Sequence, residues 1–497
     1  MEGDEQWEER AGDGGDLTAL MALVHESERI LTEEMLSREN SKISTAGDVS
    51  GESGTSTDWS IANCDPEVHE AKNICLAAFL EIMTMALEAN TSVETTPAFG
   101  STEELLPMFR GPVPPGMRVE YSIESAVVPV TPPILVSMML DVVMAEFHLP
   151  TPLVGNRKCH FVRWAREIAQ DIWAVIDTSS DYFPQRTPSI INPSEPKCRR
   201  RPSGVIVRPR EYYSEVIWIE NNEVYECQDN IYSASINSNL AFGARRWVNT
   251  LIWKLKRDIS RFSDLKMIGQ GQVKNCLLKS AESMKMVFLE CVNAATDERK
   301  WVIVHDEGTR VLKNIAADHG DSLVSNNYVA LTSMRVPANP LSVYDLIVKK
   351  NLELQQLHSQ YLEEPEEVMK LQEDDQLNCI TLHKRVVDHN ESTQISEYLL
   401  QEASRDEFCS FIIEAPMTQL EYIDAFVSGR WWNTAWRPWG FAIMADGSIH
   451  AEASLVTIAV QGQLDVKDDG EATELMSDLI NNITRKINEE VAIRGIN

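Results

Sequence analysis

The chain has 497 residues and a formal net charge of −31, from 45 Lys and Arg against 76 Asp and Glu. A chain of this length is too long to fold around a single hydrophobic core, which predicts two domains plus some unstructured chain. The negative field repels phosphate backbones, so we expect no direct DNA binding unless a separate basic element supplies it. No uncharged apolar run is long enough to span a bilayer, and residues 1–5 have neither a basic nor an apolar leader, which predicts a soluble, non-secreted protein.

The first 60 residues predict an acidic, mostly disordered segment, because they are rich in Glu, Asp, Gly, Ser and Thr and have little to bury. Residues 17–36 inside this segment form a candidate helix whose leucines fit a heptad spacing. Ser27 and Glu34 occupy two of the other seam positions, so a residual zipper and a fraying amphipathic helix are both open.

An α+β pattern follows the acidic segment. Apolar periodicity predicts helices at 73–89 and 132–143, and strands at 121–130, 159–166, 172–177, 204–208 and 215–220. In the next, long amphipathic helix, one apolar stripe is formed by Leu240, Trp247, Leu251 and Leu255. This order predicts a curved sheet covered by a lid helix.

The second half repeats the same order of elements. A helix is predicted at 273–294 and a closing helix at 475–491, with strands between them at 301–304, 328–336, 377–386, 394–401, 408–414, 440–445 and 453–460. The acidic run 363–375 is interpreted as a solvated helix face and loop. The predicted fold class is therefore α+β, with two tandem helix-grip domains at 61–262 and 263–497, each an antiparallel sheet with a long C-terminal helix.

The sequence predicts neither a metal site nor catalysis. Nine cysteines are spread without a Cys-x-x-Cys pair, which predicts reduced, mostly buried thiols. Gly-x-Ser-x-Gly, Walker and His-Glu-x-x-His motifs do not occur, and Gly269-Gln270-Gly271 lacks the third glycine of a dinucleotide loop. We therefore expect a non-catalytic protein without a cofactor. Four tryptophans at 431–439 are interpreted as either a buried plug or a partner-binding patch.

Five ordered segments carry a resemblance to a known family. They are Cys-Arg-Arg-Arg-Pro-Ser-Gly at 198–204, Val-Ile-Trp-Ile-Glu at 216–220, Phe-Gly-Ala-Arg-Arg-Trp at 242–247, and the stretches 145–154 and 440–447. From about Asn73 to the C-terminus the chain resembles the START lipid-binding domain and the START-associated region of the plant class IV homeodomain-leucine zipper transcription factors. It departs from that pattern in two places: no segment matches the basic homeodomain, and strands that the family carries after the position of Asp141 are missing.

The resemblance implies a START-like lipid-binding domain at 61–262, shortened near Asp141, and a START-associated domain at 263–497. It implies a lipid or sterol ligand and a nuclear protein that modulates transcription through protein partners, including full-length relatives. Two alternatives stay open: a free-standing sterol or phospholipid carrier in the cytoplasm, and a degenerate domain that folds poorly.

A helix-grip pocket would hold its ligand by burying apolar surface, with one or two polar groups fixing the orientation. The predicted ligand-binding residues are Trp173, Val175, Arg199, Val216, Trp218, Trp247 and Leu251. The apolar members could instead fill an ordinary core. Arg199 or its neighbour Arg200 could reach a ligand head group, or could lie solvated or pair with a carboxylate.

Overall fold

Two compact units make up the computed structural model. The first comprises Met1–Ala145 and Lys158–Glu226, and the second comprises Glu146–Arg157 and Cys227–Asn497. Each contains an antiparallel sheet with helices, which confirms the predicted fold class at that level. No described helix is both long and apolar enough to cross a bilayer. The structure describes residues 66–90, 109, 111–139, 144–183, 198–225, 229–263, 270–293, 300–315, 326–355, 365–372, 378–390, 393–448 and 452–494.

Seven strands form the first sheet, in the order β1-β7-β6-β4-β3-β2, with β5 also paired to β7. The pairs β1–β7, β7–β6, β6–β4, β4–β3 and β5–β7 are antiparallel. The strands are β1 Met117–Val128, β2 Met144–Phe147, β3 Arg157–Ala169, β4 Ile172–Ser179, β5 Arg199–Arg200, β6 Ser203–Arg210 and β7 Tyr213–Tyr225. The predicted strands are thus confirmed, and most extend further than expected.

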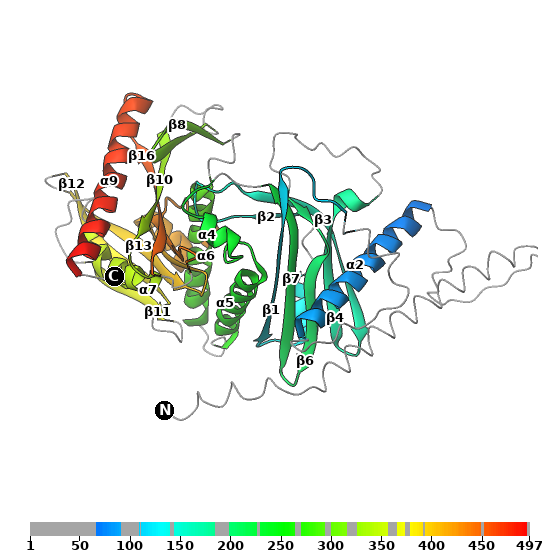
Figure 1. The fold of residues 1–497 in the computed structure, drawn as a ribbon. Helices are drawn as coiled ribbons and strands as arrows, with labels where there is room; N and C mark the ends of the chain where they lie inside the picture. The colour runs from blue at the N-terminus through cyan, green and yellow to red at the C-terminus, as the bar shows by residue number, and fades with distance from the viewer. Residues whose placement is uncertain are drawn as a thin grey trace, which may run out of the picture. The chain divides into compact units, whose positions relative to one another are not determined.

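Helix α2, Pro66–Asn90, crosses one face of this sheet (Figure 1). Its buried side chains, among them Phe79 and Met83, pack on residues of β4, β6 and β7 that alternate along each strand: Ala174, Ile176, Ile206, Ile217 and Ile219. A shorter helix, α3 Pro132–Met139, contacts β4 and β6. Because strand side chains alternate between faces, the intervening residues of β4, β6 and β7 point to the face opposite α2.

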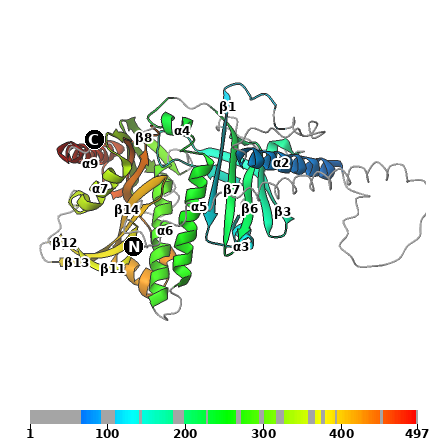
Figure 2. The same ribbon diagram turned by 60° about the horizontal axis from the view of Figure 1, so that its bottom comes forward.

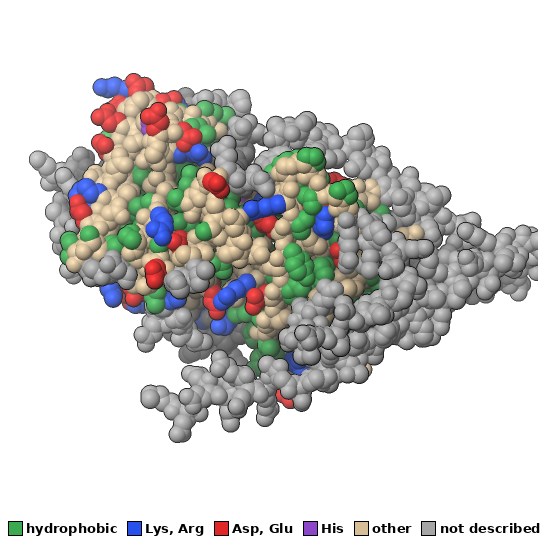
Figure 3. Space-filling view, viewed as in Figure 1, with side chains coloured by type: hydrophobic (Ala, Val, Ile, Leu, Met, Phe, Trp, Pro, Cys, Tyr) green, Lys and Arg blue, Asp and Glu red, His purple; other side chains and the backbone are tan. Residues whose placement is uncertain are grey.

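Strand β1 lies at one edge of the first sheet and shows apolar side chains at its surface. Figure 3 shows hydrophobic atoms over β1 and β7, where Val119, Tyr121 and Tyr225 are exposed. Val119, Tyr121 and Ile123 are spaced by two residues along β1 and therefore point to the same side. Ile123 packs against the α2 core, so all three residues lie on the α2 face.

Nine strands form the second sheet, in the order β11-β12-β13-β14-β15-β16-β10-β9-β8, with every neighbouring pair antiparallel. They are β8 Trp301–Glu307, β9 Thr309–Asn314, β10 Asn326–Val336, β11 Glu366–Gln372, β12 Cys379–Asn390, β13 Thr393–Arg405, β14 Cys409–Thr418, β15 Trp439–Ala445 and β16 Ser454–Leu464. The helices are α4 Ser233–Asn237, α5 Ala244–Ser263, α6 Gln270–Val292, α7 Pro340–Gln355, α8 Gln419–Tyr422, the π-helix Ile423–Val427 and α9 Asp469–Arg494.

Helices cover both faces of the second sheet. On β15, Ala442 and Met444 join the core that contains α6, whereas Phe441 and Ile443 join the core that contains α7 and α9. The closing helix α9 matches the predicted C-terminal helix. A predicted strand-and-helix order alone could not show that a second core lies on the α6 face.

Contacts group the amphipathic helix α5 with the second unit, and the domain boundary at 262 stays a prediction. Contacts end the first unit at Glu226, and α5 lies beside α6 (Figure 2). Arg257 on α5 donates to Glu402 on β13 over 2.8 Å, and both side chains are buried. Just before α4, in the segment that leads to α5, the Tyr232 hydroxyl lies 2.9 Å from that of Thr457 on β16. These buried polar contacts explain why α5 groups with the second sheet.

The acidic run 363–375 was interpreted wrongly as a helix face and loop. Residues 366–372 form the edge strand β11, in which Met369 and Leu371 alternate toward the core. Charged residues on the other face of an edge strand stay in water and limit unwanted strand pairing. Helix α7 and the strands β2 and β9 were not predicted, and the acidic segment 1–60 with its candidate helix lies outside the described residues.

Most of the tryptophan cluster is a plug of the second unit. Trp436 and Trp439 are buried, and Trp431 packs against the α6 core. Trp432 is the exception, with 62% of its surface exposed. The structure therefore favours the plug interpretation for three of the four tryptophans.

Candidate ligand-binding face

Four predicted ligand residues lie on one face of the first sheet, opposite α2. Residues that pair directly across antiparallel strands point to the same side. The register gives two apolar rows across β4, β6 and β7, which are Trp173–Val207–Val216 and Val175–Val205–Trp218. The four valines are buried and the two tryptophans are half-buried. This face presents a continuous apolar surface built by three neighbouring strands.

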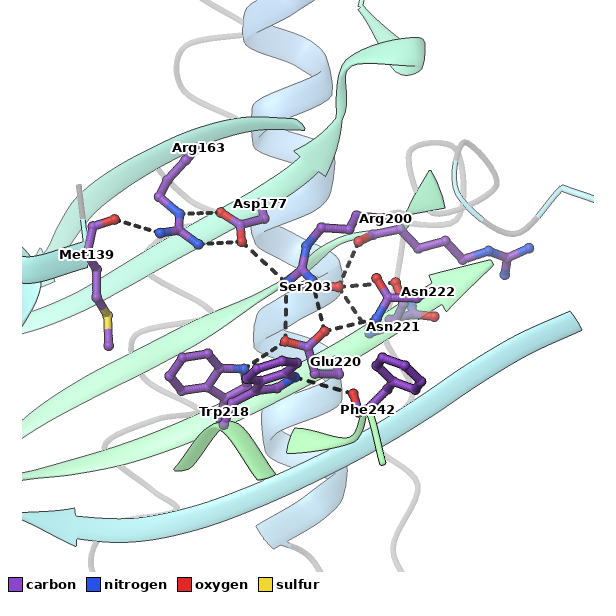
Figure 4. Close-up of polar contacts among 12 residues, drawn as sticks. Met139, Arg163, Asp177, Arg200, Ser203, Trp218, Glu220, Asn221, Asn222 and Phe242 are labelled. Carbon is purple, nitrogen blue, oxygen red and sulfur yellow. Dashed lines mark hydrogen bonds and ion pairs between the residues drawn. The ribbon is translucent and has the colours of Figure 1, made fainter. Parts of the chain in front are cut away.

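Beyond the apolar rows, the next residues of β4 and β7 on the same face are charged. Asp177 follows Val175 by two residues and Glu220 follows Trp218 by two, so both carboxylates share the face of the apolar rows. Arg200 lies between them, with Nη1 2.9 Å from Glu220 Oε2 and Nη2 3.3 Å from Asp177 Oδ2 (Figure 4). Each of these three residues is only 2% exposed.

Further hydrogen bonds hold both carboxylates in place. Arg163 donates from Nε and Nη2 to the two oxygens of Asp177, over 2.6 and 2.7 Å (Figure 4). Trp218 Nε1 donates to Glu220 Oε1 over 2.8 Å, and Asn222 Nδ2 donates to Oε2 over 2.9 Å. A network in which every carboxylate oxygen has a donor is rigid and fixes a single arrangement.

This network is balanced in charge. The two guanidinium groups of Arg163 and Arg200 face the two carboxylates of Asp177 and Glu220. Burial alone would lower the pKa of Arg200, but Glu220 and Asp177 outweigh that effect and hold the pKa above its usual value. Arg200 therefore stays charged at any physiological pH, and the network demands no further counter-ion.

Trp173 supplies a hydrogen-bond donor in the apolar part of the face. Its Nε1 is buried and has no hydrogen-bond partner among the described residues. A buried indole N–H without a partner costs free energy, which a ligand hydroxyl or carbonyl oxygen would recover. Among the described residues, the face therefore combines an apolar surface with the available Trp173 donor and a rigid polar end.

Arg199 lies on the other face of the sheet. It pairs with Glu223 across β5 and β7, and the next pair along, Arg200 with Asn222, points to the opposite side. The Arg199 guanidinium lies 3.6 Å from Glu223 Oε2 and stacks 3.9 Å from the centre of the Tyr182 ring. Of the two arginines considered from the sequence, Arg200 is the one that shares a face with the predicted apolar residues.

Trp247 and Leu251 lie on α5, in the second unit. Both are half-buried. The Trp247 ring lies 5.1 Å from that of Phe147, and its Nε1 donates to the Phe242 carbonyl over 3.3 Å. These contacts account for the position of Trp247 inside its own unit. A ligand role for either residue stays a prediction.

Sequence reasoning missed the polar end of the face and two valines at its centre. Asp177 and Glu220 continue the period of two that already linked Trp173 to Val175 and Val216 to Trp218. Extending that period by one step would have found both carboxylates. Val205 and Val207 required the register of β6 against its neighbours, which no single-strand pattern provides.

Two family models match this chain. One is the START domain, at residues 134–252, and the other is the PDF2-like C-terminal domain, at residues 270–492. The chain carries a START domain followed by a PDF2-like C-terminal domain. Neither model describes a homeodomain. The START match spans β3 to β7 and therefore contains the whole candidate face, and it continues into α5.

The homologues of this START-domain chain are class IV homeobox-leucine zipper proteins. Homeobox-leucine zipper protein HDG3 of Arabidopsis thaliana is 30% identical over 326 residues, which are 62% of this chain and 43% of HDG3. Protein ROC4 of Oryza sativa subsp. japonica is 27% identical over 383 residues, 71% of this chain and 46% of ROC4. The chain spans less than half the length of these two relatives.

Solved structures give a weaker match. Human StAR-related lipid transfer protein 5 aligns with 44% of this chain and 98% of its own, at 10% identity and a TM-score of 0.27. A score this low supports no argument about ligand or activity.

Proposed function

We propose that this START domain binds one lipid or sterol on the face opposite α2, and that the protein is a non-catalytic regulator. The observation that carries the proposal is the convergence of Trp173, Val175, Val216 and Trp218 in two apolar rows that end at a buried polar network. Burial of apolar ligand surface against such rows stabilises a complex by about 25 cal/mol per Å².

Orientation of the ligand would come from the polar groups. Trp173 Nε1 offers a hydrogen bond beside the apolar rows, and the Arg200–Glu220 pair forms the polar end. Since the network is neutral overall, it favours an uncharged polar group such as a hydroxyl over a bare phosphate, which would leave excess negative charge in a buried place.

For the whole chain we propose a nuclear role in which ligand binding modulates transcription through protein partners, including full-length homeobox-leucine zipper proteins. Support comes from the relatives, which carry the homeobox name, and from the net charge of −31, which opposes direct contact with DNA. Regulation by competition with full-length relatives is the simplest form of this role.

Retention of lipid by the purified full chain tests the ligand. The chain is incubated with mixed-lipid vesicles, re-isolated and extracted, and the lipid is identified by mass spectrometry. Val216→Thr introduces a hydroxyl on the apolar face and should lower the retained lipid several-fold. Ile217→Val, on the α2 face, is the matched control: it should cost about 1 kcal/mol of stability and leave retention unchanged. Equal retention by both variants would overturn the proposed face.

A second experiment separates a regulator from a carrier. The full chain is used to capture epitope-tagged full-length relatives, and in parallel to move a fluorescent lipid between vesicles. Capture without transfer supports the regulatory role. Transfer without capture would instead identify a free-standing carrier, and a lack of both would contradict each function.

A further inference from the structure

Strand β1 differs from the other edge strands of the described sheets. The edges are β1 and β2 in the first sheet and β8 and β11 in the second. Strand β2 has only four residues, and β8 and β11 each have a register break against their neighbouring strand. Strand β1 pairs with β7 along all 12 of its residues without a break. Short length and bulges keep an edge from pairing with further strands, and β1 has neither.

Large apolar side chains of β1 are exposed on the α2 face. Val119, Tyr121 and Val127 are 38%, 42% and 58% exposed. All three lie an even number of residues from Ile123 and therefore share its face. No described strand pairs with the outer edge of β1. An apolar row on a long, regular edge strand is a template for pairing with another strand.

The opposite face of β1 carries charges of both signs. Glu124 pairs directly with Trp218 across β1 and β7, so its side chain points away from α2. Arg118 and Glu120 lie an even number of residues from Glu124 and share this face, and Arg118 donates to Glu120 over 2.9 Å. The half-buried Glu124 has no ion-pair partner among the described residues. A strand that pairs with β1 can therefore gain by bringing a cation to Glu124.

We propose that β1 pairs antiparallel with β1 of a second copy of this chain, about a two-fold axis through Tyr121. In this register Arg118 of each copy faces Glu124 of the other, which makes two opposite-charge pairs. On the α2 face, Val119 of each copy faces Ile123 of the other, and the two Tyr121 side chains face each other. The charged face and the apolar face of β1 are thus each complementary to themselves.

Charge selects this register over its neighbours. A two-fold axis perpendicular to the sheet keeps like faces together only when it passes through a residue of β1. An axis through Glu120 places that carboxylate opposite its own copy, and an axis through Ser122 places Glu120 opposite Glu124. Like charges directly opposite each other destabilise a strand pair. An axis through Ile123 brings no opposite charges together, and an axis through Val119 shortens the paired segment.

The association should be weak and should depend on concentration. A single pair of strands buries less surface than the roughly 1,200 Å² at which stable protein complexes begin. The pairing would join the first sheets of two chains edge to edge, and it uses residues of β1 alone. It does not depend on whether the face opposite α2 binds a lipid.

Sedimentation velocity of the full chain over a concentration series tests the proposal. The wild type should shift from monomer toward dimer as the concentration rises. Glu124→Arg places arginines opposite each other at both charge pairs and should weaken the association about tenfold or more. Glu211→Arg is the matched control, because it makes the same charge reversal at an exposed turn between β6 and β7. A wild type that stays monomeric, or a Glu124→Arg protein that associates like the control, would overturn the proposal.

A charge swap shows whether the loss comes from the proposed pairing. Arg118→Glu alone should also weaken association. When it is mixed with the Glu124→Arg protein, every residue 118 faces an opposite charge at residue 124, so the mixture should dimerise although each variant alone does not. A cooperative thermal melt of each variant confirms that it is folded. A mixture that associates no better than its components would contradict the register, and a dimer that persists in both variants would place the contact elsewhere, such as in residues 17–36.

Cysteine cross-linking reads the register directly. Tyr121→Cys places a thiol on the two-fold axis, opposite its own copy, and should give a reducible cross-linked dimer under mild oxidation. Val127→Cys is the control, since Val127 is exposed on the same face but lies away from the axis. It should cross-link no more than the wild type, whose own cysteines set the background. Cross-linking at residue 127 and not at residue 121 would assign another register and overturn the proposal.

Discussion

Buried ion networks occur in both units, and they differ in charge balance and in the elements they join. In the first unit Arg163 and Arg200 face two carboxylates, and nearly all the contacts are made between strands of one sheet. In the second unit a single carboxylate, Glu402 on β13, receives Arg257 from α5 at 2.8 Å and lies 3.9 Å from Lys285 of α6.

The surroundings of the second network compensate for its excess of positive charge. Lys285 Nζ lies 4.5 Å from the centre of the Trp253 ring and 4.1 Å from that of Phe411, and it donates to the Ser404 hydroxyl. Cation–π contacts of desolvated cations are worth up to about 2 kcal/mol. This network links two helices to a sheet, whereas the first network lies at the end of two apolar rows of one sheet.

Buried charge alone therefore does not mark a ligand site. A network between a sheet and its covering helices is explained by the packing that it secures. A balanced network at the end of two apolar rows, with an unpartnered indole N–H nearby, is not explained by packing alone. Substitutions in each network separate these two cases.

Glu402→Gln should be the most damaging change. It removes the buried carboxylate that lies next to both Arg257 and Lys285, and loss of one partner of a buried pair costs about 3–5 kcal/mol. Chemical denaturation of the full chain measures the loss. Glu407→Gln is the matched control, since Glu407 pairs with Arg245 over 3.2 Å while both side chains are largely exposed. It should cost less than about 1 kcal/mol. Similar losses in the two variants would contradict a structural role for the buried network.

Arg200→Met should cost about 3 kcal/mol, because Asp177 and Glu220 then lose a buried cation. Its neighbour provides a direct comparison: Arg199→Met, on the other face and partly exposed, should cost less than about 1 kcal/mol. Lipid retention should fall in the first variant and persist in the second. If both variants behaved alike, the assignment of the two arginines to opposite faces would be wrong.

The loss of unfolding free energy caused by Glu402→Gln should depend on pH. Burial alone would raise the pKa of Glu402, but Arg257 and Lys285 outweigh it and lower the pKa below its usual value. A carboxyl group with a lowered folded-state pKa stabilises the protein fully above its unfolded-state pKa, and this stabilisation is lost as the pH falls through the folded-state pKa. The stability gap between wild type and variant should therefore be constant near pH 7 and narrow only in acid. A gap that widened in acid would contradict the assigned direction.

Trp173→Phe should have the smallest effect on stability, within about 1 kcal/mol, because the removed N–H has no hydrogen-bond partner in the described part of the chain. Lipid retention should nevertheless fall a few-fold if this N–H donates to the ligand. Trp164→Phe is the control, since Trp164 Nε1 is also buried without a partner but its ring packs on the α2 side. Equal retention by the two variants would remove Trp173 as a donor.

Periodicity predicted much of this architecture and the apolar part of the face. Trp173 and Val175 are two residues apart, as are Val216 and Trp218. This spacing puts the two members of each pair on the same side of their strand, without knowledge of the strand register. Of two adjacent arginines, Arg200 and not Arg199 shares the face of the apolar rows, because the phase of a two-residue strand cannot be determined from local sequence. Helix α5 shows the same limit at a larger scale. Its apolar stripe predicts a helix, but the sheet that this helix packs near follows from tertiary contacts such as the buried Arg257–Glu402 pair.

Cross-linking of a photoactivatable lipid to the full chain shows which face of the first sheet binds it, with the modified residues located by fragmentation mass spectrometry. We expect modification at Trp173, Val175, Val216 and Trp218, which share the face opposite α2. Modification confined to the α2 side, at Ile206 or Ile217, or confined to the second unit, would contradict it.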